Sequence, residues 1–209
     1  SMEIAWNQNS GARFNFNKMG ISLEIAGYYQ TGKIAQNTLS AYYGMAGLSF
    51  KTKSGITVGA GCEHFSGKAG NDQSKTIKSF TPWYGTNHKF NGYMDYFFVN
   101  NHKFSVGLTD IYLNLIYEKN KFKATITPHM FASAAKLYVG NEAQNSNLGN
   151  ELDLTLQYQI VRNIVLTAGY SQMFATKSMQ ILKGGDYKAL NNWTYIALHF
   201  SPEIFNYKN

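Results

Sequence analysis

The sequence predicts an all-β chain, an antiparallel up-and-down transmembrane β-barrel with about ten strands. Three observations lead to this fold class. Apolar and polar residues alternate in runs of about ten, roughly the length that a tilted strand needs to cross a bilayer. Short and long connections alternate along the chain, and no apolar run approaches the ~18 residues that a membrane helix needs. The composition, 15% aromatic and 15% charged, suits a two-faced wall, but a soluble sandwich would give the same average.

The clearest element is a hairpin over residues 151–176. A period of two places alternate side chains on opposite faces of a strand. The return arm is less regular, because Val165 interrupts the pattern, and aromatic residues stand towards the far ends of both arms. In the first arm, Leu152, Leu154, Leu156, Tyr158 and Ile160 alternate with Glu151, Asp153, Thr155, Gln157 and Gln159.

The same alternation predicts nine strands, or ten if residues 2–8 form a short one. Pro128 is awkward within its strand, since proline removes a ladder donor and prefers an edge or a bulge. The nine strands are expected at residues 12–17, 21–31, 39–52, 56–63, 108–117, 121–131, 151–160, 164–176 and 191–200.

The connections sort into two lengths that alternate, as in outer-membrane barrels with tight periplasmic turns and long external loops. Residues 66–107 are expected to form a long external or infolded loop, with residues 89–99 as a short extra strand or an infolded segment. Residues 1–209 are therefore interpreted as one barrel domain, or as the C-terminal part of one. The short connections are 18–20, 53–55, 118–120 and 161–163; the long ones are 31–38, 66–107, 136–149 and 177–190.

The formal charge of +7 arises from 19 basic and 12 acidic residues. Most lysines are scattered over predicted turns and loops, which disfavours a nucleic-acid partner and suits a solvated rim beside outer-membrane lipid and lipopolysaccharide. The single Cys62 lies on the apolar side of its strand and excludes an intrachain disulfide. No secretion signal follows Ser1, so we expect the natural chain to extend upstream.

The polar face of the strands is predicted to line a pore, because polar and charged linings are how pores select their solutes. The alternative is that the same residues fill a narrow interior with ion pairs, as in a barrel of about ten strands. The predicted pore-lining residues are Arg13, Glu24, Lys51, Glu63, Asp110, Asn114, Lys123, His129, Asp153 and Gln157.

Aromatic and polar residues of the long loop are predicted to form a constriction or to contact a sugar. His88 with Asp95 could hold a metal or a sugar, but ordinary hydrogen bonding within the loop is the preferred interpretation. The five histidines include no pair at short spacing and there is no cysteine pair, so neither a metal nor a cofactor is expected. The loop residues are Trp83, Tyr84, His88, Lys89, Tyr93 and Asp95.

Residues 79–97, SFTPWYGTNHKFNGYMDYF, resemble the alginate-export-type outer-membrane barrel proteins of Bacteroidetes-like bacteria. Supporting stretches are GYYQTGK at 27–33, GLTDIYLNLIY at 107–117 and WTYIALHFSPEIF at 193–205. The resemblance implies a wall of about eighteen strands, of which this chain would be the C-terminal half. It also implies passive passage of a solute, in the type member an acidic polysaccharide, through a basic lumen. Here the predicted inward residues mix both charges, which does not support an anion preference.

The expected function is therefore an outer-membrane porin-like channel for passive passage of polar solutes or oligosaccharides. The alternative is a non-conducting β-barrel that binds or anchors a partner. An enzyme is not expected: His199 and Ser201 share a face, but no activating third residue can be placed beside them.

Overall fold

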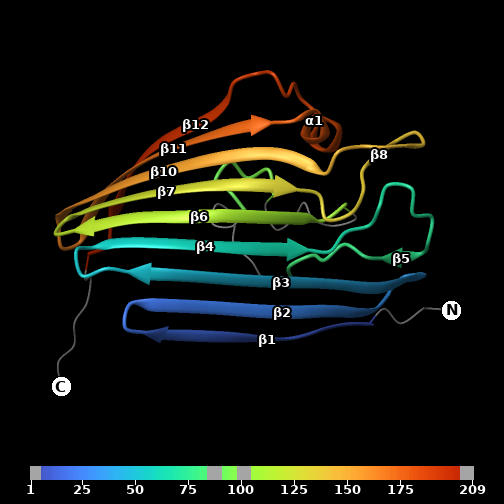
Figure 1. Ribbon diagram of the computed structural model, residues 1–209, viewed down its shortest axis with the longest axis horizontal. Coiled ribbons are helices and arrows are strands. Elements are labelled where there is room, and N and C mark those ends of the chain that lie inside the picture. The colour runs from blue at the N-terminus through green and yellow to red at the C-terminus, as the bar shows by residue number, and fades with distance from the viewer. Residues whose placement is uncertain (1–5, 84–90, 98–104, 203–209) are drawn as a thin grey trace.

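Nine long antiparallel strands follow one another in a single sheet in the computed structural model, which describes residues 6–83, 91–97 and 105–202 (Figure 1). The strands are β1 (Trp6–Lys18), β2 (Ile21–Ile34), β3 (Asn37–Lys51), β4 (Ile56–Phe65), β6 (Leu108–Lys119), β7 (Phe122–Ala132), β10 (Asn147–Val161), β11 (Ile164–Ala175) and β12 (Asn191–Phe200). Shorter elements are β5 (Thr76–Ile77), which pairs with β3, the β8 (Tyr138–Val139) and β9 (Glu142–Ala143) hairpin, and α1 (Lys177–Lys183). The predicted all-β antiparallel class is confirmed.

The period of two separates an apolar face from a polar face along this sheet. On β6, Leu113 is 56% exposed on one face, whereas Asp110 on the other is 1% exposed. The register keeps like residues together, since Leu113 lies opposite Ala60 and Asp110 lies opposite Glu63. The alternation predicted for the hairpin over β10 and β11 is present in the same way.

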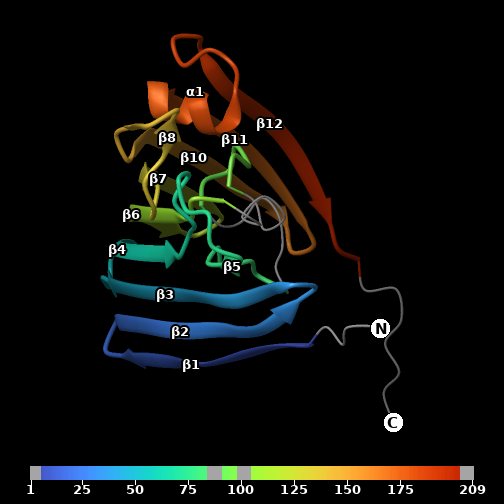
Figure 2. The same cartoon turned by 90° about the vertical axis from the view of Figure 1, so that its right-hand side faces the viewer.

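The sheet is curled (Figure 2), and its polar side is the concave one, because Asp110, Glu151 and Asp153 bond residues 91–97 inside the curl. β1 and β12 are its two edges, and eight successive antiparallel pairings make them run in the same direction. Among residues 6–83, 91–97 and 105–202, no pairing joins β1 to β12. Closure into a barrel therefore stays a prediction. No helix in these residues is long and apolar enough to cross a membrane.

The connections distinguish a turn end of the sheet from a loop end, at the left and right of Figure 1. The turn end carries tight hairpins such as Met19–Gly20, where both residues have positive φ (54° and 82°), as the twist of a two-residue hairpin requires. The loop end carries the connection that contains β5, the β8–β9 hairpin and α1.

Two predicted boundaries are wrong. Residues 31–38 do not form a long loop, because β2 and β3 pair as far as Ile34 and Asn37 around the two-residue turn Ala35–Gln36. Residues 6–8 are not a separate tenth strand, since they continue β1 and pair with Thr31–Lys33. In both places the strands continue beyond the apolar part of the sheet. Polar residues there still pair with the neighbouring strand, so a change from apolar to polar residues does not mark the end of the strand.

The polar connections at 136–149 and 177–190 contain structure that alternation does not predict. The first holds the β8–β9 hairpin, and the second begins with α1. Thr176 caps this helix, since its hydroxyl accepts the Met179 N–H at 3.4 Å.

Pro128 lies in the interior strand β7 rather than at an edge. The β6–β7 register has a gap there, between the pairs Tyr112–His129 and Leu115–Ile126. The Thr127 hydroxyl donates to Asn114 Oδ1 at 2.9 Å, so a side-chain bond crosses the interrupted ladder.

A tyrosine ring lies over a glycine on the neighbouring strand at three places on the concave face. The pairs are Gly11–Tyr28, Gly61–Tyr112 and Gly169–Tyr195, each directly opposite in the register. A Cβ added to Gly61 would lie 2.4 Å from the Tyr112 ring. Glycine at these positions lets an aromatic ring lie flat against the wall, as in the aromatic cover of strand glycines.

We expect Gly61→Ala to destabilise the protein by about 1–3 kcal/mol, because the new methyl group overlaps the Tyr112 ring. The measurement is urea unfolding of refolded protein in detergent. Gly47→Ala is the matched control, since its Cβ would lie 3.7 Å from Tyr112 Oη, in ordinary contact. Equal stability of the two variants would contradict this account.

Candidate functional site

The concave side of the sheet has three zones that follow one another from the loop end to the turn end. At the loop end an apolar core joins the strands to the connections that fold over them. Its members include Leu39, Phe65, Leu108, Phe131 and Met173 from the strands, and Ile77, Phe80, Phe97 and Met179 from the connections. This zone is filled with side chains.

Next to the core lies a carboxylate layer, which we define as Glu63, Asp110, Glu151 and Asp153 together with His129. They come from β4, β6, β10 and β7, and each is at most 8% exposed. His129 Nδ1 is 3.0 Å from Asp110, and its Nε2 is 3.6 Å from Asp153 Oδ2. Tyr43 Oη donates to Glu63 Oε2 at 3.0 Å. Buried carboxylates need partners of this kind, since an unpaired buried charge is strongly unfavourable.

Residues 91–97, here called the inserted segment, lie against this layer and are held by its carboxylates. The Asn91 amide donates to Asp110 Oδ2 at 3.2 Å. The backbone N–H of Tyr93 donates to Asp153 Oδ2 at 3.2 Å, and that of Met94 donates to Glu151 Oε1 at 3.0 Å. Three carboxylates on two strands thus fix a part of the long connection inside the curl of the sheet.

The close approach of the inserted segment depends on Gly92. Its φ is +84°, and a Cβ added to it would lie 2.5 Å from Glu151 Oε1. Asn91, directly before it, and Asp95, three residues after it, also have positive φ, 58° and 57°. At position 92, glycine is the residue that tolerates both this left-handed conformation and the close contact with Glu151.

α1 covers the loop-end side of the inserted segment. The Lys183 ammonium lies 5.2 Å from the centre of the Phe97 ring, and Phe97 in turn packs on Phe131 with ring centres 4.8 Å apart. Burial in this apolar setting lowers the pKa of Lys183 to about 8. The helix and the inserted segment therefore pack as one unit over the carboxylate layer.

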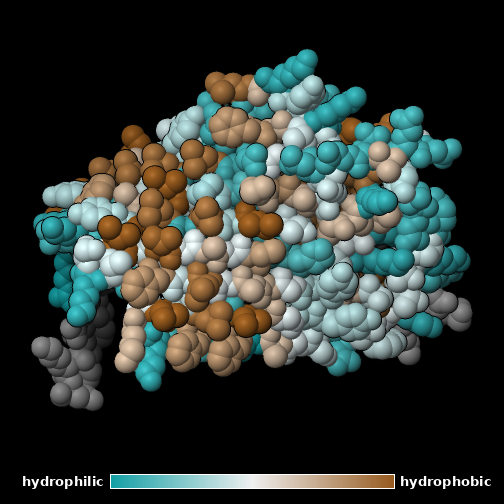
Figure 3. Space-filling model, in the orientation of Figure 1, coloured by the Kyte–Doolittle hydropathy of each residue, from teal (hydrophilic) through white to brown (hydrophobic). Residues whose placement is uncertain are grey.

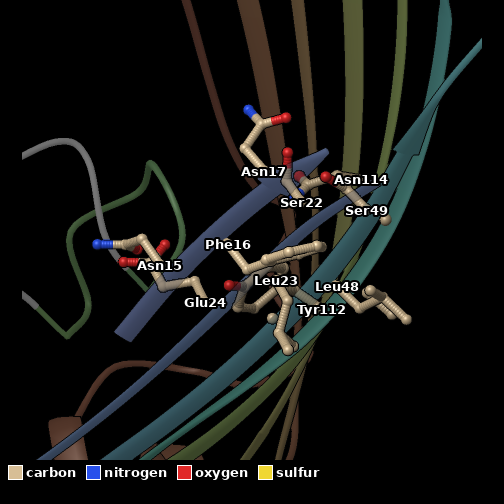
Figure 4. A pocket seen from close by; sticks show the side chains of 13 residues that line it. Asn15, Phe16, Asn17, Ser22, Leu23, Glu24, Leu48, Ser49, Tyr112 and Asn114 are labelled. Atoms are coloured by element: carbon tan, nitrogen blue, oxygen red, sulfur yellow. The ribbon is translucent and has the colours of Figure 1, made fainter. Parts of the chain in front are cut away.

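The third zone, at the turn end, is a hollow of about 290 Å³ against β1 to β4 and β6 (Figure 4). Its polar lining is mostly uncharged, and the Glu24 carboxylate is paired with Arg13 on the neighbouring strand. Gly47 and Gly59 also line it, and because they have no side chains they leave its space unfilled. The polar lining residues are Asn15, Asn17, Ser22, Glu24, Ser49, Tyr112 and Asn114.

The convex face of the sheet is apolar over the half nearest the turns and hydrophilic towards the loop end (Figure 3). Exposed aromatic residues border the aliphatic ones on both sides. From Tyr42 to Phe50 on β3, eight residues apart, the band spans about 27 Å along the strand. The aromatic residues are Phe16, Phe50, Tyr117, Phe122, Tyr158 and Phe200 on the turn side, and Tyr29, Tyr42, Tyr170 and Phe174 on the loop side.

The residues predicted to line a pore all fall on the concave side of the sheet, but they occupy different zones. Glu63, Asp110, His129 and Asp153 meet in the carboxylate layer. The remaining six lie nearer the turn end. These are Arg13 paired with Glu24, Lys51 paired with Glu118 at 3.4 Å, Asn114 bonded to Thr127, and Lys123, which lies opposite Gln157. Whether they line an open path stays a prediction.

The predicted loop residues are only partly described. Tyr93 and Asp95 belong to the inserted segment and are half-buried, whereas Trp83 is 38% exposed. Tyr84, His88 and Lys89 lie outside the described residues. Within the described part of the chain, no group of three or more His, Cys, Asp or Glu side chains could hold a metal ion.

Sequence reasoning left Glu151, Asn91 and Gly92 out of the candidate site. Glu151 is predicted to face inward, because it has the same strand parity as Asp153, but it was not included among the pore-lining residues. Asn91 and Gly92 carried only a turn signal, since their contacts with β6 and β10 join residues 19 and about 60 positions apart in the sequence.

Comparison with known proteins identifies a fold but no family. No family model matches the chain, and no curated protein does. Among solved structures, the chain is similar to a NanC porin in a rhombohedral crystal form, with a TM-score of 0.51 and 11% identity over 94% of this chain and 79% of that one. The chain therefore has a porin-like antiparallel β fold.

We expect Glu151→Ala to release the inserted segment, because the Met94 N–H loses its acceptor. Hydrogen exchange at residues 92–97, followed by mass spectrometry in detergent, should rise at least tenfold. Gln157→Ala is the matched control, since Gln157 lies on the same face of β10 but is not one of the residues that bond the inserted segment. Unchanged protection of residues 92–97 in Glu151→Ala would show that the carboxylates do not hold the segment.

Proposed function

We propose that this protein is an outer-membrane porin-like channel for passive passage of polar solutes. The observation that carries the proposal is the pairing of an apolar convex face, bordered by aromatic residues, with a concave face of polar and charged residues. Outer-membrane barrels have this arrangement, with an apolar band about 25 Å tall between two aromatic girdles. A soluble protein rarely exposes so large an apolar surface. Closure of the sheet into a barrel is part of the proposal.

The zones of the interior suggest how such a channel would treat its solutes. The turn-end hollow of about 290 Å³ has a mostly uncharged polar lining, which suits neutral polar molecules. Beyond it, the inserted segment narrows the path at the carboxylate layer. The carboxylate layer contains four carboxyl groups and one imidazole, so the narrow zone favours neutral and cationic solutes over anions.

The resemblance to alginate-export-type barrels enters this proposal as its finer part. The resemblance rests on residues 79–97 and the three supporting stretches, and it would make the chain the C-terminal half of a wall of about eighteen strands. The acidic character of the narrow zone argues against an acidic polysaccharide as the solute of this chain. No catalytic role is proposed.

We expect Leu113→Arg to destabilise the protein in lipid vesicles by about 2–4 kcal/mol, because it places a charge in the middle of the lipid-facing band. The measurement is reversible urea unfolding from vesicles. Leu190→Arg makes the same exchange in a connection outside the band, at a site that is 77% exposed, and should change stability by less than about 0.5 kcal/mol. Equal effects, or a chain that stays monomeric in buffer without detergent, would contradict the membrane assignment.

We expect the full-length protein to conduct in planar bilayers and to prefer K⁺ over Cl⁻. Asp153→Asn keeps an acceptor for the Tyr93 N–H but removes a charge from the narrow zone, so the permeability ratio should fall at least twofold towards one. Glu142→Gln, in the exposed β8–β9 hairpin, is the matched control and should leave the ratio unchanged. A silent bilayer would instead favour the alternative, a non-conducting barrel that binds or anchors a partner.

A further inference from the structure

Two rows of concave side chains cross the sheet next to each other at the turn-end hollow. In the first row, Asn17, Ser22 and Ser49 lie opposite one another on β1, β2 and β3 (Figure 4). In the second row, Asn15 and Tyr112 stand at the two ends. Each residue lies directly opposite the next in the full rows, which are Asn17–Ser22–Ser49–Gly59–Asn114 and Asn15–Glu24–Gly47–Gly61–Tyr112.

Five side chains of these rows keep their hydrogen-bonding groups uncommitted. Asn15 and Asn17 are exposed, Ser22, Ser49 and Tyr112 are half-buried, and all five line the hollow. Within the part of the chain that the structure describes, none of them forms a side-chain hydrogen bond. In the carboxylate layer, by contrast, the polar groups are buried and already bonded to one another or to the inserted segment. The hollow is therefore the zone that offers accessible groups to a ligand.

The chemistry of this lining selects for a neutral ligand that carries hydroxyl groups. An amide and a hydroxyl can each both donate and accept a hydrogen bond, and a ligand hydroxyl can do the same. The lining contains no lysine or arginine, and its one carboxylate, Glu24, is paired with Arg13 on the neighbouring strand. An anionic ligand would thus lose hydration without gaining an unpaired opposite charge.

The size of the hollow corresponds to one small molecule. Its volume of about 290 Å³ lies at the lower end of ligand pockets, which hold roughly 300–1,000 Å³. The space exists because Gly47 and Gly59 occupy the middle of the rows. Side chains on neighbouring strands stand about 4.8 Å apart, and successive inward positions on one strand about 7 Å apart. A compact ring with a hydroxyl on most of its carbons can contact several points of such a grid at once.

We propose that the turn-end hollow is a binding site for a neutral monosaccharide. The amides of Asn15 and Asn17 and the hydroxyls of Ser22, Ser49 and Tyr112 bond the hydroxyls of the sugar. The inference rests on the proposed channel and deepens it by naming a class of solute. Binding through accessible, uncharged groups is weak, which suits passive passage, because a solute must leave its site as readily as it enters.

The test is a nuclear magnetic resonance titration of the full-length protein with glucose, in lauryldimethylamine oxide micelles, which carry no sugar headgroup. The backbone N–H resonances of Gly47 and Gly59 should shift saturably. Asn15→Leu/Asn17→Leu should weaken the affinity at least tenfold. Asn7→Leu/Asn9→Leu is the matched control and should leave it unchanged, since it makes the same exchange on the same face of β1, outside the hollow.

Two further measurements test the space and the charge of the site. Gly47→Leu should also weaken glucose binding at least tenfold, because a Cβ there meets nothing closer than 3.7 Å and the rest of the side chain fills the hollow. Glucuronate, the same ring with a carboxylate, should bind at least fivefold more weakly than glucose. The proposal is overturned by wild-type resonances that do not shift, by equal affinity of the wild type and either hollow variant, or by equal affinity for glucuronate.

Failure of the sugar site and failure of the channel give different results, because the titration does not depend on conduction. A protein that conducts K⁺ but whose resonances do not respond to glucose overturns the site alone. A protein that binds glucose in the hollow while the bilayer stays silent supports the site and overturns the channel.

Discussion

The two-residue period of the β-strand is the constraint on which the architecture depends. Each long strand directs one set of side chains to the convex face and the other to the concave face, and the register keeps the two sets aligned from strand to strand. A slip of one residue would move Asp110 to the apolar face and Leu113 to the polar face. The tight hairpins at the turn end help to prevent this slip, since they fix which residues lie opposite one another.

The charged residues of the polar set that are buried on the concave side need partners, and this need organises that side of the sheet. The carboxylates of the layer obtain hydrogen bonds from backbone N–H groups of the inserted segment, from His129 and from Tyr43. The same bonds supply acceptors for a segment without regular secondary structure, whose backbone groups would otherwise be buried unpaired. The apolar core above it and α1 then complete the filling of the loop end. The turn end, where glycines and mostly uncharged polar side chains line the wall, is left hollow.

Alternation and turn chemistry were sufficient to predict the long strands, the two faces and most hairpins, because these depend on neighbours along the chain. The strand boundary near Ile34 and the continuity of β1 through Trp6–Gln8 were predicted wrongly, since polar residues there lie beyond the apolar band yet still pair. The carboxylates were recognised as inward-facing from their parity alone. Their assembly with Asn91 and Gly92 was not predictable, because it depends on a long connection folding back over β6 and β10.

The odd number of strands in the path has a consequence for the margins of the sheet. Because β1 and β12 run in the same direction, direct pairing between them would form one parallel pair in an otherwise antiparallel sheet. A parallel ladder has slanted bonds and is slightly weaker per residue than its antiparallel counterpart. One additional strand between β1 and β12 would restore antiparallel pairing throughout. In hydrocarbon every bare amide and carbonyl along such a margin costs several kcal/mol. The facing edges of β1 and β12 are therefore where unpaired backbone groups would cost this chain the most free energy in a bilayer.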